Sequence, residues 1–121
     1  MADQFSFGDE VPASYVEFVD NMLGQTSFEV LASFFPNFDT LDKFAVLDAF
    51  AGVPTYIVVG TKDLLTSVDH SRRMAKLLPS ATLVECAGAG HMVILERKDK
   101  VNATLEKLFA AALDQPETQV S

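Results

Sequence analysis

Two short apolar segments, each followed by a glycine-containing turn and a polar side chain, most constrain what this chain can fold into. The first reads Val-Pro-Thr-Tyr-Ile-Val-Val-Gly-Thr-Lys-Asp and ends at Asp63. The second reads Ala-Thr-Leu-Val-Glu-Cys-Ala-Gly-Ala-Gly-His and ends at His91. A helical pattern separates them, and this alternation predicts an α/β fold with two parallel strands. Because the carboxyl ends of parallel strands meet at one edge of a sheet, we expect an acid and an imidazole in one crevice.

Residues 51–121 alternate strand, helix, strand, helix. The apolar run from Tyr56 to Val59 predicts a strand covered on both faces. Thr66 and Asp69 have the spacing of a capping box, which predicts a helix from there to about Leu78, ended by Pro79. Residues 82–85 form the next expected strand, with Leu83 inward, and the tail beyond residue 114 is expected to fray. The last helix should bury an apolar stripe at helical spacing: Val101, Leu105, Leu108, Phe109 and Ala112.

The first fifty residues have a helical pattern. Pro12 suits the first position of a helix in which apolar residues recur at helical spacing through Leu23. A second helix should end before Pro36, because proline restricts the residue that precedes it. A third should be capped at Asp39 or Thr40. Its buried residues would be Leu41, Phe44 and Leu47.

Charge and aromatic content change near Gly52. Residues 1–50 hold nine acids against one base, Lys43, and nine of the ten phenylalanines, whereas residues 51–121 hold eight acids and eight bases. We therefore expect two units, a helical segment over 1–50 and an α/β segment over 51–121. The phenylalanines either line an apolar substrate tunnel or form the packing faces of short helices. We favour packing for most of them.

The two strand-and-turn segments resemble a known family. Val53-Pro54-Thr55 leading into Lys62-Asp63 is similar to the acid-bearing strand and loop of α/β-hydrolase-fold enzymes, and Gly88-Ala89-Gly90-His91 is similar to their histidine loop. The family order of nucleophile, acid and histidine is respected by Asp63 and His91. The resemblance is close from residue 53 to about 113 and loose before it. It implies the C-terminal part of an α/β-hydrolase fold, with residues 1–50 as the end of a lid.

The nucleophile of that family is missing, because no Gly-x-Ser-x-Gly elbow occurs in the sequence. The segments expected to form an oxyanion hole are also missing, and domains of this class run to about 250 residues. We therefore expect a fragment that is inactive alone, from a parent that hydrolyses an apolar acyl ester. A parent with an aspartate nucleophile, such as a haloalkane dehalogenase or epoxide hydrolase, is an alternative. So is a non-catalytic truncated domain that binds partners through its Phe-rich helices.

The candidate catalytic residues are His91 as general base and Asp63 as the acid that orients it. Against this, His91 could merely cap a turn, and Asp63 could bond its own backbone. Asp69 and Glu85 are weaker rivals for the acid. His70 is expected to be solvated, and Cys86 to be a small core residue.

The sequence gives little support to other classes of protein, such as nucleic-acid-binding, membrane or metal-binding proteins. The acidic balance, a net charge of −8, disfavours nucleic acid and anionic membranes as partners. No apolar run approaches a membrane span, and the opening residues lack the features of a signal peptide. No zinc spacing or dinucleotide fingerprint is present, so we expect no metal or cofactor. A lone cysteine favours a cytoplasmic location, and unpaired apolar surface leads us to expect self-association.

Overall fold

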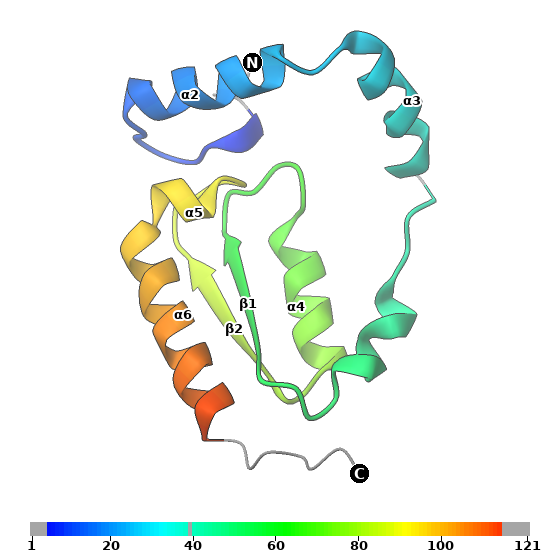
Figure 1. Cartoon of the computed structure of the whole chain (residues 1–121), viewed down its shortest axis with the longest axis vertical. Coiled ribbons are helices and arrows are strands. Elements are labelled where there is room, and N and C mark those ends of the chain that lie inside the picture. Colours follow the sequence, from blue (N-terminus) through cyan, green and yellow to red (C-terminus); the bar gives the residue numbers. More distant parts are fainter. Residues whose placement is uncertain (1–4, 39, 115–121) are drawn as a thin grey trace.

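The computed structural model describes residues 5–38 and 40–114, and Figure 1 shows the path of the chain. Three helical segments come first: α2 (Ala13–Gly24), α3 (Phe28–Phe38) and the 3-10 helix η1 (Phe44–Phe50). Strand β1 (Thr55–Gly60), helix α4 (Val68–Leu77) and strand β2 (Ala81–Cys86) follow. The short helix α5 (Val93–Glu96) and the long helix α6 (Lys98–Leu113) complete the described part.

The two strands pair in parallel, which confirms the α/β class. Their register runs from Thr55 opposite Ala81 to Gly60 opposite Cys86. Helix α4 contacts both strands, α6 contacts β1, and the strands lie between these two helices in Figure 1. Because both strands end at the same level, the chain leaves each of them at the same edge of the sheet.

Residues 6–9, far away in sequence, lie against the loop that follows β2. The carbonyl of Ser6 accepts a hydrogen bond from the amide of Met92 at 2.8 Å, and the amide of Asp9 donates to the carbonyl of Gly88 at 2.8 Å. Phe7 is buried and packs with Val19 of α2 in an apolar cluster that also includes residues of and beside α5. The amino-terminal segment and the histidine loop therefore form one packed unit.

Glycine permits this close approach of three backbone segments. A Cβ atom on Gly60 would overlap the carbonyls of Ala89 and Gly90, and one on Gly90 would overlap backbone atoms of Phe7 and Gly8. Backbone atoms cannot swing aside as the end of a long side chain can. The end of β1, the histidine loop and the amino-terminal segment are thus stacked at a spacing that any larger residue would disturb.

The helices before Gly52 differ from the sequence expectations. Helix α2 begins at Ala13, so Pro12 occupies the position just before the helix. Helix α3 continues through Pro36, which lies in its last turn, where the missing amide removes a single hydrogen bond near a helix end. The third segment is a 3-10 helix whose first amide, that of Phe44, donates to the Asp42 carboxylate at 3.1 Å. The cap expected at Thr40 is therefore wrong, and Asp39 lies outside the described residues.

The capping box expected at Thr66 and Asp69 is also wrong. Ser67 is the cap of α4, and its hydroxyl accepts the amide of Asp69 at 3.2 Å. Thr66 instead directs its hydroxyl to Asp63, 3.0 Å away. A nearby carboxylate is a stronger acceptor than the competing local groups, and it draws the threonine away from the helix end.

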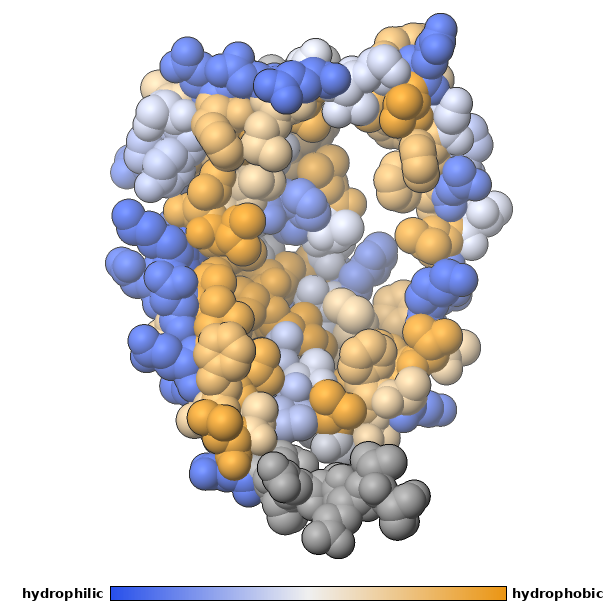
Figure 2. All heavy atoms as spheres, in the orientation of Figure 1, coloured by the Kyte–Doolittle hydropathy of each residue, from blue (hydrophilic) through white to orange (hydrophobic). Residues whose placement is uncertain are grey.

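Much of the apolar surface is uncovered. Helix α3 buries none of its residues, and Phe28 is 83% exposed, so the expectation that its phenylalanines are packed is wrong within this chain. On α6 the buried residue is Thr104, while Leu105 and Phe109 of the expected stripe are exposed. Figure 2 shows apolar side chains along α6 and along α3 and η1. In the described ranges no helix is both long and apolar enough to cross a membrane.

The stacked backbone predicts that Gly90→Ala lowers the free energy of unfolding by about 1–3 kcal/mol, because the new methyl group must displace backbone. Gly24→Ala is the matched control, since a Cβ atom there meets nothing within 4 Å and α2 would gain a better helix former. Urea unfolding of both variants at one fixed protein concentration measures the difference. Equal stability of the two variants would contradict the stacking.

Self-association is the second prediction from the fold. Leu113 and Phe28 are more than four-fifths exposed, and each strand of the two-stranded sheet in the described chain has one edge without a strand partner. The net charge of −8 opposes association but is screened beyond about 8 Å at physiological salt. Light scattering coupled to gel filtration should find oligomers at micromolar concentration, and Phe109→Glu should reduce them. A sharp wild-type monomer that unfolds cooperatively would contradict this prediction.

Candidate active site

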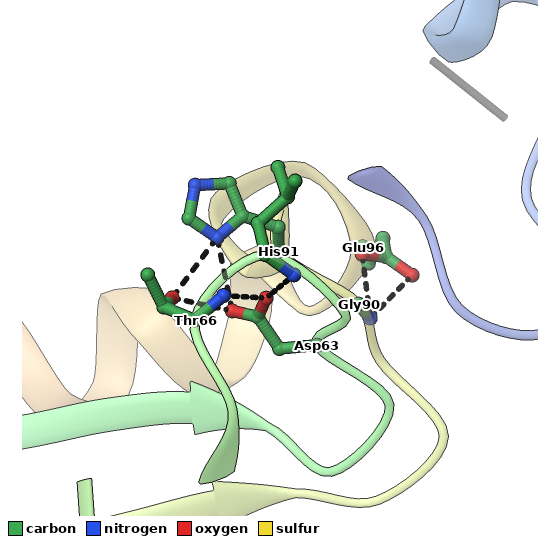
Figure 3. Close-up of polar contacts among 6 residues, drawn as sticks. Asp63, Thr66, Gly90, His91 and Glu96 are labelled. Carbon is green, nitrogen blue, oxygen red and sulfur yellow. Dashed lines mark hydrogen bonds and ion pairs between the residues drawn. The ribbon is translucent and has the colours of Figure 1, made fainter. Parts of the chain in front are cut away.

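Asp63 and His91, expected from the sequence to meet, lie within hydrogen-bond distance. The Nδ1 atom of His91 is 2.9 Å from the Oδ2 atom of Asp63 (Figure 3). Asp63 stands three residues after β1 and His91 five residues after β2. The common level at which the strands end therefore brings the two loops together.

The Asp63 carboxylate is nearly enclosed and accepts four hydrogen bonds. Its side chain is 5% exposed, against 39% for His91. Oδ1 accepts the amides of Leu65 and Thr66 at 2.9 and 2.8 Å, and Oδ2 accepts the Thr66 hydroxyl in addition to His91. Asp63 thus closes its own turn through both oxygens and also contacts the imidazole through Oδ2.

These hydrogen bonds set the charge state of Asp63. Burial alone raises the pKa of the carboxyl group, because it disfavours the ionised form. The amide of Thr66, the ring of His91, the hydroxyl of Thr66 and the amide of Leu65 together outweigh burial and hold the pKa of Asp63 below its ordinary value of 3.8. Asp63 is therefore ionised at neutral pH beside the imidazole.

The loops that carry the two residues are joined by main-chain hydrogen bonds. The amide of Thr61 donates to the carbonyl of Cys86 at 3.0 Å, and that of Lys62 to the carbonyl of Ala89 at 2.9 Å. The amide of Gly88 returns a hydrogen bond to the Thr61 hydroxyl at 2.9 Å. The separation of Asp63 and His91 is consequently fixed by backbone as well as by their own contact.

Glu96 holds the histidine loop from the other side, a role that the sequence pattern does not predict. Its carboxylate accepts the amide of Gly8 at 2.8 Å and that of Gly90 at 2.9 and 3.1 Å (Figure 3). Both partners are backbone amides, one of them 88 residues away, and α5 was not expected from the sequence. No local pattern of residue types could have identified this role.

The rival residues do not contact His91. Asp69 and Glu85 both bond Arg72, at 3.3 and 2.7 Å. His70 is exposed on α4, as expected, with its ring edge-on to Phe44 at 6.4 Å. Cys86 is 1% exposed and behaves as a core residue.

Ser6 is a further hydroxyl residue that the fold brings beside the histidine loop, through its carbonyl bond to Met92. No hydrogen bond between its own hydroxyl and His91 is found in the described structure. Over the same residues, no group of three or more histidine, cysteine, aspartate or glutamate side chains is arranged to hold a metal ion. The site therefore consists of an acid and an imidazole, with Thr66 against both.

The low pKa of Asp63 predicts how stability changes with pH. A carboxyl group with a depressed folded-state pKa stabilises fully above its ordinary value, and that contribution is lost as the pH falls through the lowered pKa. Asp63→Asn should therefore unfold more easily than wild type at neutral pH, and the gap should shrink in acid. Urea unfolding over a pH series measures it, with Asp69→Asn as the surface control. A gap independent of pH would contradict the assignment.

Two comparisons with known proteins bear on the family of this chain. Residues 12–98 match the alpha/beta hydrolase fold family, a range that includes both Asp63 and His91. Over 62 residues the chain is 39% identical to the polyketide synthase ThaQ of Burkholderia thailandensis, a match that covers 47% of this chain and 3% of that synthase. The chain thus spans a small part of the length of that relative. Because the family match extends over well more than half of the sequence, the chain belongs to the alpha/beta hydrolase fold family.

Proposed function

We propose that this chain supplies the general base, His91, and the orienting acid, Asp63, of a hydrolase that cleaves acyl esters through a serine nucleophile. The hydrogen bond between His91 Nδ1 and an enclosed, ionised carboxylate is the observation that carries the proposal. The nucleophile and the oxyanion hole belong to residues outside these 121. An imidazole paired in this way is suited to proton transfer at its other nitrogen.

The proposed chemistry begins at Nε2 of His91, to which no described residue is hydrogen-bonded and which points away from Asp63 in Figure 3. Nε2 takes the proton of the serine hydroxyl as its oxygen attacks the acyl carbonyl. The same nitrogen returns the proton to the departing alcohol, which leaves an acyl-enzyme. Nε2 then takes a proton from water, whose oxygen attacks the acyl-enzyme, and the acid is released as the serine hydroxyl is restored.

Asp63 stays ionised throughout in this mechanism. Its carboxylate accepts the Nδ1 proton and stabilises the imidazolium that forms when Nε2 is protonated. Its low pKa supports this role, because a group that holds its proton weakly does not remove the proton from Nδ1. Enclosure strengthens the effect, since the charge of a side chain that is 5% exposed is poorly screened by water.

We infer an acyl substrate with an apolar chain from the relative and from the exposed apolar residues of this chain. The relative named a polyketide synthase makes acyl chemistry the favoured class, and esters and thioesters pass through the same tetrahedral intermediate. The exposed phenylalanines of α3 offer apolar surface of the kind that covers such a chain. In this proposal residues 1–50 are the end of a lid, and residues 51–121 are the C-terminal part of the catalytic core.

The proposal is tested by measuring ester hydrolysis with the isolated chain and with the whole protein. The isolated chain should hydrolyse short acyl esters no faster than free imidazole. In the whole protein, His91→Ala should lower kcat on the order of 10³-fold or more, with a comparable or smaller loss for Asp63→Asn. His70→Ala, the second histidine, is the matched control and should change little.

Three results would count against the proposal. Undiminished turnover by the His91→Ala protein would remove the base assignment. A covalent burst from the isolated chain would mean that it contains its own nucleophile, and Ser6→Ala would then show whether Ser6 is that group. An aspartate in place of the serine elbow in the whole protein would redirect the chemistry to carbon–halogen or epoxide cleavage.

A further inference from the structure

We propose that Thr66 is a positioning residue for the acid and base, one that holds both oxygens of Asp63 and directs the proton of His91 to Nδ1. The role of Thr66 in catalysis rests on the proposed function. Its geometry and its decisive measurement are independent of catalysis. The sequence pattern predicts Thr66 as the cap of α4, but Ser67 performs that role.

Thr66 holds the carboxylate at two points. Its amide donates to Oδ1 at 2.8 Å and its hydroxyl donates to Oδ2 at 3.0 Å. Two donors from one residue fix the plane of the carboxylate, because rotation about the Cβ–Cγ bond of Asp63 would break both contacts at once. The β-branched side chain of threonine adds to this, since its own χ1 is restricted.

The same hydroxyl lies against the imidazole. Thr66 Oγ1 is 3.3 Å from Nδ1 of His91, while Nδ1 is 2.9 Å from Oδ2 of Asp63 (Figure 3). A hydroxyl has one proton, and here that proton is committed to Asp63. Nδ1 therefore faces two acceptors, a carboxylate oxygen and the lone pairs of the hydroxyl, so the stable tautomer has its proton on Nδ1 and leaves Nε2 free as the base.

Enclosure makes the hydroxyl difficult to replace. The Asp63 side chain is 5% exposed, so water has little access to a carboxylate oxygen that loses a donor. Thr66 itself is exposed, and its side chain fills no interior space. Removal of the hydroxyl should therefore affect the acid and the imidazole while leaving the packing of the chain intact.

Nitrogen NMR of the full 121-residue chain tests the proposal directly. The sequence has two histidines, so the ring ¹⁵N signals of His91 are read beside those of His70 as an internal control. With the imidazole neutral, wild type and Thr66→Ser should show His91 in the Nδ1–H form. Thr66→Val and Thr66→Ala, which both lack the hydroxyl, should move His91 toward a mixture of tautomers and leave the His70 signals unchanged.

The NMR signals of these variants can overturn the role of Thr66. Unchanged His91 signals in Thr66→Val and Thr66→Ala would overturn the positioning role, as would failure of Thr66→Ser to keep the wild-type signals. Asp63→Asn separates the two proposals, because unchanged His91 signals in that variant would remove the acid–base pair itself. In the whole protein, Thr66→Val should lower kcat about tenfold or more with KM unchanged, and Thr66→Ser should restore it.

Discussion

The parallel register of β1 and β2 is the constraint on which the rest of this structure depends. Gly60 lies opposite Cys86, so the chain leaves both strands at one level. The amides of Thr61 and Lys62 can then reach carbonyls of the histidine loop. A register shifted by one residue would move each contact by about 3.3 Å and separate Asp63 from His91. The short distance between Asp63 and His91 thus depends first on how the two strands pair.

The sequence predicted this part of the chain well because its signals are local. An apolar run bounded by turn residues indicates a strand wherever it occurs, and the strands around Val58 and Val84 were both anticipated. The positions of Asp63 and His91 at the strand ends followed from the α/β class alone. Other parts of the site could not be predicted, because Glu96 bonds amides that are distant in the sequence and its choice of Gly8 depends on the folded path of residues 6–9.

Thr66 and the last helix show how the available partners of a residue overrule a pattern read from the sequence. A threonine three residues before an aspartate is a sound helix start, yet the enclosed carboxylate of Asp63 is a better partner for its hydroxyl, and Ser67 is available to cap α4 instead. On α6 the apolar stripe is present in the sequence, but Phe109 is 62% exposed because the described residues offer two strands to cover it. Burial depends on the neighbours that a helix finds as well as on its own periodicity.

The Asp63–His91 site and the exposed apolar surface differ in how far this chain provides their partners. The acid–base pair is held by hydrogen bonds within residues 60–96 and by the amide of Gly8, all of which this chain provides. The exposed faces of α3 and α6 have no such internal partners in the described chain. Hydrogen bonds are directional and satisfied pairwise, whereas apolar burial needs a matching surface. Under the proposed function, this chain would complete its active site together with further protein that covers those helices.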